Sequence, residues 1–240
     1  VPFNINPSQV EAALIKWFES VWLRPSDLNA QTLRTRLQKI YLPMYLVDGK
    51  VTGNWQAQAG YNYQVVSSEE NFNSGQWKSQ QITKTRIRWE PRTGTIDRQY
   101  DNIAVPAVDD HDALINALGD YTISAAQPYS VEALTDSSVR APTLTPDSAW
   151  SYAQSGFNHF AADECQAASD AQHIENFSLN GEYQNLNWTQ LLLPLYTTAY
   201  KDDDGKVHRV MISGQSGRVH GKLRASPKTA WLWAGIIAAS

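Results

Sequence analysis

The histidines are the residues of this chain best suited to bind a metal ion, and two of them lie near each other in the sequence. His208 and His220 fall on neighbouring predicted strands that follow the acidic turn Asp202–Asp204. Two imidazoles and a carboxylate can form part of a transition-metal site. Such a site needs three or four ligands in a defined geometry, and the turn lacks the alternating ligands and distant glutamate of a calcium loop. We therefore predict solvent-exposed strand histidines, a solvated turn and no metal site.

A second group of reactive residue types lies on one predicted helix. His159 and Asp163 share a face of this helix at spacing i, i+4. A catalytic Cys–His pair requires hydrogen-bond contact, whereas six residues place His159 and Cys165 far apart around the helix, so Cys165 is expected in the core. The chain also lacks a Walker phosphate loop, a His-Glu-x-x-His motif and a Gly-x-Ser-x-Gly motif. We predict no catalytic residue and no cofactor.

Basic side chains alternate along the predicted strand 81–89. Lys84, Arg86 and Arg88 occupy one face of this strand, because successive side chains point to opposite faces. A basic strand face can contact the phosphates of a nucleic acid or of an anionic lipid, and the alternative is a solvated face of an antiparallel sheet. These three residues are the candidate anion or nucleic-acid contacts.

The composition limits the function classes. Of the 240 residues, 42% are hydrophobic and 18% are charged, which is enough apolar sequence for a folded core. Twenty basic and 24 acidic side chains give a net charge of −4, so no overall basic field attracts nucleic acid. The single cysteine excludes an internal disulfide framework and a cysteine-rich zinc site.

The N-terminal half predicts helices followed by antiparallel strands. Asn6 is a helix N-cap, with Pro7 at the first helical position and Gln9 completing a capping box. A weaker helical stretch covers residues 28–37. Strands are then predicted over 40–47, 51–66, 81–89 and 95–105, separated by an Asp48-Gly49 hairpin, a polar loop over 67–75 and a turn over 91–94.

The C-terminal half predicts two further helices and a second group of strands. A short helix over 109–118 is stopped by Gly119, and residues 120–144 form a connecting segment. A longer helix begins at Thr145 and carries an apolar stripe that includes Cys165. Irregular chain is predicted to about residue 189, followed by strands over 191–199, 207–212 and 218–223 with turns at 202–205 and 214–217.

Two stretches resemble each other and indicate an internal repeat. Tyr41-Leu42-Pro43-Met44-Tyr45 precedes Asp48-Gly49-Lys50-Val51, and Leu192-Leu193-Pro194-Leu195-Tyr196 precedes Asp204-Gly205-Lys206-Val207. Proline cannot donate to a ladder and is expected at the beginning or edge of a strand. We predict an α+β fold of two related helix-plus-antiparallel-meander units packed together, over residues 1–119 and 145–229. The alternative is a coincidence in a tyrosine-rich sheet protein.

The last residues form a mostly apolar run. Residues 230–239 are uncharged, and a bilayer crossing needs about 20 such residues. We expect residues 230–240 to be the start of a truncated transmembrane helix beginning near Trp231; the alternative is a short helix packed on the core. The stretch Gly205–Thr229 before this run contains six cations and no acidic residue, which favours a cytoplasmic position for this side. The cations are Lys206, Arg209, Arg218, Lys222, Arg224 and Lys228.

Several of these segments resemble one bacterial family. The Leu191–Tyr196 segment and the turn Gly214-Gln215-Ser216-Gly217-Arg218 resemble zinc-ribbon-containing membrane proteins of unknown function, often labelled as related to a primosomal replication helicase. Ile40–Tyr45 and Tyr100–Ala107 also match, so the resemblance covers most of the chain. It implies membrane helices downstream. The ribbon ligands are absent here, and Ser213 and Ser216 replace the family's Asn and Thr.

These observations favour a non-catalytic interaction or scaffold domain of a membrane-anchored bacterial protein, at the cytoplasmic face and with a protein partner. One alternative is a nucleic-acid-binding accessory domain, which predicts salt-dependent binding through Lys84, Arg86 and Arg88. Another is an uncharacterised hydrolase, which predicts a deep pocket that holds histidines and carboxylates.

Overall fold

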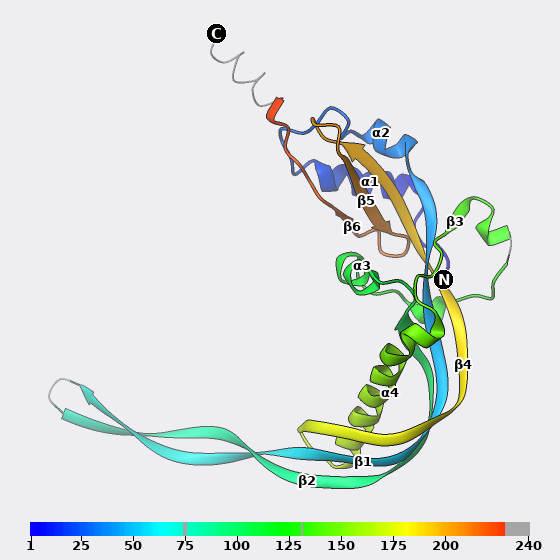
Figure 1. Ribbon diagram of the computed structural model, residues 1–240. Helices are drawn as coiled ribbons and strands as arrows, with labels where there is room; N and C mark the ends of the chain where they lie inside the picture. Colours follow the sequence, from blue (N-terminus) through cyan, green and yellow to red (C-terminus); the bar gives the residue numbers. More distant parts are fainter. Residues whose placement is uncertain (74–75, 131, 229–240) are drawn as a thin grey trace. The chain divides into compact units, whose positions relative to one another are not determined.

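The computed structural model describes residues 1–73, 76–130 and 132–228 (Figure 1). The strands form one sheet in the order β2-β1-β4-β5-β6, and β3 pairs with β1. The predicted α+β class is confirmed. The helices are α1 (Pro7–Phe18), α2 (Ala30–Thr35), α3 (His111–Leu118) and α4 (Pro146–Ala168), and the strands are β1 (Gln38–Asn73), β2 (Gln76–Pro106), β3 (Ser137–Val139), β4 (His173–Lys201), β5 (Val207–Ser213) and β6 (Val219–Gly221).

The chain divides into two compact units whose segments alternate along the sequence. Unit 1 comprises Val1–Tyr45, Pro106–Ala149 and Thr189–Ser240, and unit 2 comprises Leu46–Val105 and Trp150–Trp188. These boundaries differ from the predicted division into residues 1–119 and 145–229. The difference arises because β1, β4 and α4 each contribute residues to both units.

Unit 1 contains a core between its first two helices and the sheet. The capping box of α1 is confirmed, because Asn6 Oδ1 accepts from the Gln9 backbone N–H at 3.0 Å and Gln9 Oε1 accepts from the Asn6 N–H at 2.9 Å. Helical spacing places the apolar residues of α1 on one face. The buried residues of this core are Val10, Leu14, Phe18, Leu28, Leu33, Tyr196, Tyr200, Val210 and Ile212.

Unit 2 packs α4 against β1, β2 and β4. Phe157 is fully buried, and its ring centroid lies 6.1 Å from that of Tyr100 and 5.6 Å from that of Tyr183. Gly156 allows close approach of β2, because a Cβ there would lie 2.5 Å from Ile103 Cγ2. The predicted stripe of this helix is confirmed, and Cys165 is buried on it.

The strands are longer than predicted, and several predicted turns are wrong. The Asp48-Gly49 hairpin, most of the loop over 67–75 and the turn over 91–94 all lie within β1 or β2, and β4 begins at His173 rather than near residue 191. Glycines in these strands make room for aromatic rings instead of forming turns. A Cβ at Gly94 would lie 2.9 Å from the Trp55 indole nitrogen, and one at Gly60 would lie 2.7 Å from Trp89.

Left-handed residues occur inside two of the long strands. Asn102 in β2 has φ 60°, and Asn176 and Asn185 in β4 have φ 53° and 55°. Asparagine tolerates this conformation better than most residues, and left-handed residues inside strands are typical of β-bulges. These asparagines therefore lie within strands. For Asn176 and Asn185 this differs from the prediction of irregular chain to about residue 189.

The predicted internal repeat is not confirmed. Its two Leu-Pro-x-Tyr segments lie on the neighbouring strands β1 and β4, but residues 48–51 continue β1 while Asp204-Gly205 lies between β4 and β5. Neither proline begins its strand. Pro194 lies one residue beyond the last β4–β5 pair, Leu195 with Ser213, so on that side its missing N–H costs no ladder hydrogen bond.

Among the described residues, no helix combines the length and hydropathy that a membrane crossing requires. The helix expected to begin near Trp231 lies in residues 229–240, outside the described residues.

Candidate functional site

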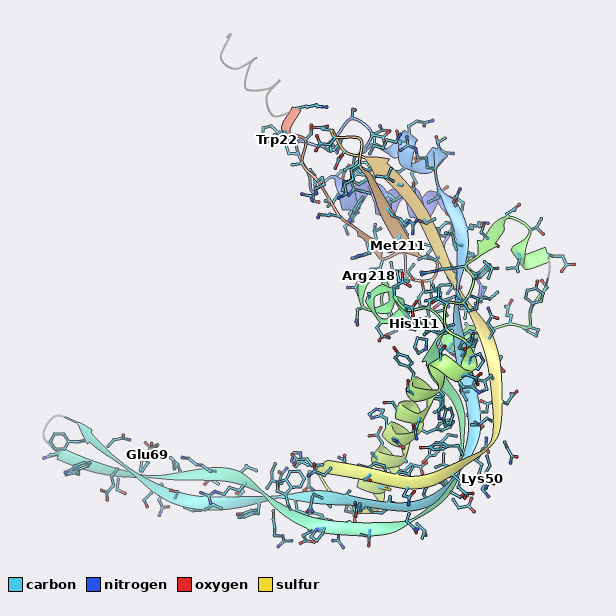
Figure 2. The ribbon with its side chains drawn as sticks, viewed as in Figure 1. Trp22, Lys50, Glu69, His111, Met211 and Arg218 are labelled. Atoms are coloured by element: carbon cyan, nitrogen blue, oxygen red, sulfur yellow. The ribbon has the colours of Figure 1, made fainter. Side chains whose placement is uncertain are left out.

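The most exposed part of unit 2 is a two-stranded antiparallel ribbon, here called the arm, formed by residues 62–73 of β1 and 76–88 of β2. The pairing direction follows from the contact of Gly60 with Trp89 and from the contact of Phe72 with Trp77. None of the described side chains of the arm is buried, and only Val65 and Ile82 are half-buried. Figure 2 shows side chains projecting from both sides of these strands around Glu69.

The predicted basic stripe lies on the arm and occupies one face. Ile87 and Trp89 pack over Gly60, on the face toward which a Gly60 Cβ would point. By strand alternation, Lys84, Arg86 and Arg88 occupy the other face, which they share with Tyr61 and Tyr63 of β1. Tyr63 is 46% exposed and all three basic residues are exposed. This face therefore combines cations with aromatic rings.

The charge of the stripe is partly neutralised at one end. Glu90 accepts ion pairs from Arg88 and Arg92, each at 3.0 Å. Arg92 also lies over the Tyr61 ring, 5.9 Å from its centroid, and donates to the Tyr61 hydroxyl at 3.2 Å. Lys84 and Arg86 have no acidic partner among the residues that the structure describes. Among the described side chains of the arm, these two therefore carry positive charge that no carboxylate neutralises.

The far end of the arm carries exposed apolar side chains. Phe72 is 61% exposed and Trp77 is 69% exposed, and their ring centroids lie 5.2 Å apart. Val66, six residues before Phe72 on β1, is 63% exposed. We did not predict this feature, because the segment 67–75 was expected to be a loop. The available signal was the pair of aromatic residues on either side of Ser74-Gly75, which is typical of a cross-strand pair.

The predicted turn Gly214-Gln215-Ser216-Gly217-Arg218 is confirmed as a turn. Its hydrogen bonds connect it to other segments of unit 1. Gly214 O accepts from the Asn4 N–H at 2.9 Å, Gly214 N–H donates to Pro194 O at 2.9 Å, and Gln215 Oε1 accepts from the Thr122 N–H at 2.7 Å. Gly214 has no space for a side chain, because a Cβ would lie 2.7 Å from both Phe3 and Pro194. Of the five residues, Ser216 and Arg218 are exposed.

The two strand histidines are not brought together. His208 is buried, so the prediction that it is solvent-exposed is wrong; its Nε2 lies 2.7 Å from Asp202 Oδ2 and its ring stacks on Tyr200 at 5.2 Å. This hydrogen bond is the main cause that lowers the pKa of Asp202. His220 is exposed and pairs with Met211 rather than His208. Within the described ranges, no three potential ligands converge on a metal position.

The residues on α4 also have separate partners. His159 Nε2 lies 3.6 Å from Asp163, and both side chains are exposed. Glu164 forms a two-pronged ion pair with Arg98 at 3.0 Å, which lowers the pKa of the Glu164 carboxyl. Burial raises the pKa of the Cys165 thiol, so this cysteine has the properties of a core residue rather than of a nucleophile.

Comparison of the chain with protein-family models, curated proteins and solved structures finds no match in any of the three. The residues themselves therefore carry the functional assignment.

Proposed function

We propose that this chain is a non-catalytic interaction module of a membrane-anchored bacterial protein and that the arm is its partner-binding element. The observation that carries this proposal is the exposure of Val66, Phe72 and Trp77 on a ribbon none of whose described side chains is buried. A two-stranded ribbon is at best marginally stable by itself in water, and grouped exposed apolar side chains mark interaction surfaces. A bound partner would remove these side chains from water.

The membrane anchor and the cytoplasmic location are supported by sequence features. The resemblance to the bacterial zinc-ribbon membrane proteins implies membrane helices downstream, and the apolar run near Trp231 follows six cations without an acidic residue. Both features agree with a module held at the cytoplasmic face of a membrane.

Site-specific photo-crosslinking in bacterial cells tests the arm. A photoreactive amino acid replaces Trp77, and the matched control replaces Tyr152, an aromatic residue on α4 that is 47% exposed. We expect an adduct of defined mass from position 77 that is absent from position 152, and we expect Phe72→Asp to reduce its yield. The same adducts from both positions, or none from position 77, would contradict the proposal.

A nucleic-acid accessory function is the second candidate, and the observation that favours it is the shared face of Lys84, Arg86 and Tyr63. Gel-shift titrations of single-stranded DNA at several salt concentrations test it. Binding through the stripe predicts that Lys84→Glu/Arg86→Glu/Arg88→Glu reduces the salt slope by about 2. The matched control reverses Lys201, Lys206 and Lys222, which are exposed lysines of unit 1. Equal slopes for both triple variants would remove this candidate.

A further inference from the structure

Unit 1 contains a hollow on one face of the sheet, opposite the face that packs against α1 and α2. Along β4, Tyr196 and Tyr200 belong to the core packed against α1 and α2, whereas Leu195 and Ala199 line the hollow. Its volume is about 570 Å³, which is within the range of small-molecule sites. The apolar lining comes from β1, β4, β5, β3 and α3, namely Ile40, Leu42, Leu195, Met211, Val139 and Leu114; Figure 2 labels Met211.

Three arginines are among the residues that line the same hollow, and no acidic residue is. They are Arg36, Arg140 and Arg209, which come from three distant parts of the sequence. No aromatic side chain and no histidine is among the lining residues. Neither stacking nor acid–base chemistry is therefore favoured, and the lining lacks the histidines and carboxylates that the hydrolase alternative requires.

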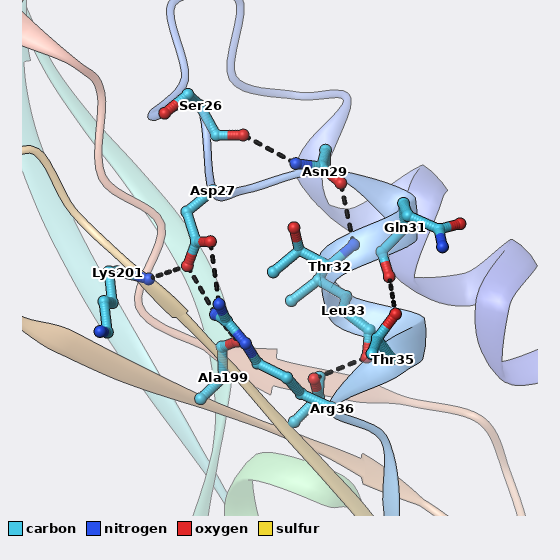
Figure 3. Close-up of polar contacts among 11 residues, drawn as sticks. Ser26, Asp27, Asn29, Gln31, Thr32, Leu33, Thr35, Arg36, Ala199 and Lys201 are labelled. Atoms are coloured by element: carbon cyan, nitrogen blue, oxygen red, sulfur yellow. Dashed lines mark hydrogen bonds and ion pairs between the residues drawn. The ribbon is translucent and has the colours of Figure 1, made fainter.

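Arg36 is held in position by a carboxylate outside the hollow lining and by the backbone oxygen of one lining residue. Its guanidinium donates to both oxygens of Asp27, at 2.6 and 3.1 Å, and to the backbone oxygen of Ala199 at 3.2 Å (Figure 3). Asp27 also accepts from the Lys201 N–H at 2.7 Å. The hydrogen bond from Arg36 lowers the pKa of the Asp27 carboxyl. Arg140 is fixed in the same manner by Asp110, at 2.8 and 3.0 Å.

Arg209 differs from the other two because it has no acidic partner among the residues described. In the β4–β5 register it lies directly opposite Ala199, whose carbonyl oxygen accepts from Arg36. Directly opposite residues of antiparallel strands have Cβ atoms about 5 Å apart. Two cationic side chains therefore lie beside Ala199, and of these Arg36 is paired with a carboxylate whereas Arg209 is not. An anion placed there would be held by charge-assisted hydrogen bonds.

We propose that this hollow binds a free long-chain carboxylate, with the head group at Arg209 and Arg36 and the acyl chain on the apolar lining. The planar fork of a guanidinium matches the two oxygens of a carboxylate. Most of the remaining lining is apolar, which suits a hydrocarbon chain. The proposal is independent of the arm, because every residue of the hollow belongs to unit 1.

Methyl NMR of the full chain provides a site-specific test, because the sequence contains two methionines. Met211 lines the hollow, whereas Met44 is 4% exposed and does not line it. Dodecanoate is titrated below its micelle concentration into protein with ¹³C-methyl methionine, and Met211→Leu assigns the resonances. We expect a saturable shift of the Met211 methyl, little change at Met44, and much weaker binding of dodecanol.

Two variants decide the role of the lining. Arg209→Gln is expected to weaken dodecanoate binding about tenfold or more, while Arg224→Gln, an exposed arginine outside the hollow, leaves it unchanged. Val139→Trp, at a 40% exposed lining position, is expected to obstruct the hollow without removing a charge. Circular dichroism confirms folding. An unshifted Met211 methyl, equal affinity for dodecanol, or equal affinity of Arg209→Gln and the unmodified protein would overturn the proposal.

Discussion

Two segments with the same four residues, Asp-Gly-Lys-Val, have different structures in the two units. Residues 48–51 lie inside β1 in unit 2, where Asp48 accepts from the Asn102 N–H at 2.8 Å and from the Asn187 side chain at 3.2 Å. Residues 204–207 lead from the β4–β5 turn into β5 in unit 1, and Gly205 has φ +78°. An identical tetrapeptide is thus a strand with neighbours on both sides in one unit and a turn in the other.

The difference shows that neighbours, rather than the tetrapeptide, decide the structure. Val51 is fully buried, whereas Val207 is 59% exposed. In the turn, the organising carboxylate is Asp202, which accepts from the N–H groups of Asp204 and Lys206 at 3.1 and 2.9 Å. Matched substitutions at the four shared positions should therefore have large effects in unit 2 and small effects in unit 1.

The largest difference is expected at the glycines. A Cβ at Gly49 would lie 2.7 Å from Leu186 and 3.0 Å from Phe157, so we expect Gly49→Ala to lower the free energy of unfolding by about 2–3 kcal/mol through overpacking. Gly205→Ala meets no atom within 4 Å and should cost only the left-handed backbone, about 1 kcal/mol. Urea denaturation followed by circular dichroism measures both. A costlier change at Gly205 would reverse the comparison.

The aspartates come next. Asp48→Ala leaves the Asn102 N–H and the Asn187 amide without their acceptor, and we expect a loss of about 2 kcal/mol. The Asp204 side chain is exposed, so Asp204→Ala should change the unfolding free energy by less than about 0.5 kcal/mol. The same urea titration tests the pair. Similar midpoints for both variants would show that the hydrogen bonds of Asp48 contribute little to the free energy of unfolding.

The valines should differ slightly less. Val51→Ala removes two methyl groups from a fully buried position, with an expected cost of about 1–2 kcal/mol. Val207→Ala at its exposed position should cost less than about 0.5 kcal/mol. Thermal unfolding monitored by calorimetry distinguishes them, and Val51→Thr serves as a control of similar shape that should be destabilising because of its buried hydroxyl.

The turn of unit 1 should be sensitive to pH through Asp202. Its pKa is lowered, first by the hydrogen bond from His208; burial is the next largest effect and raises it, and the backbone N–H groups of Lys206 and Asp204 lower it further. A carboxyl whose pKa is lower when folded stabilises the fold above its unfolded pKa, near 3.9 for Asp, and loses this contribution as the pH falls through the folded pKa. Asp202→Asn should therefore be less stable than the unmodified protein at pH 7, with the difference shrinking below pH 4. A difference constant from pH 7 to pH 2 would contradict this.

The lysines should differ least. Lys50 Nζ lies 2.8 Å from Asp97, but both side chains are more than one-third exposed, so Lys50→Gln should cost about 0.5 kcal/mol or less. Lys206→Gln, at an exposed position, should have no measurable effect. Repeating the urea titration of Lys50→Gln in 1 M salt should abolish its small effect, and persistence of the effect would assign it to packing instead.

The sequence predicted those features that short-range chemistry determines. The capping box at Asn6, the end of α3 at Gly119, the stripe of α4 and the turns near Asp204 and Gly217 are confirmed. Each depends on residues within a few positions of one another.

The remaining features depend on contacts between distant residues. The Asp48-Gly49 turn prediction is wrong because Leu186 and Phe157 fill the space beside Gly49. The arginine-lined hollow was not predicted, because Arg36, Arg140 and Arg209 meet only through the sheet and β3. Strand alternation predicted the shared face of Lys84, Arg86 and Arg88, and their exposure agrees with the solvated face given as the alternative. The length of the two-stranded arm that carries them was not predicted.

β1 and β4 contribute residues to both units, so the register of these two strands affects both units. A slip of β1 by one residue would exchange its inward and outward side chains along its whole length. Val51 in unit 2 would then leave its buried position. In unit 1, Tyr41, which contacts Phe3, and Leu42, which lines the hollow, would exchange faces. Contacts in both units therefore depend on the same register of β1, so a misaligned β1 would lose native contacts in unit 1 and in unit 2.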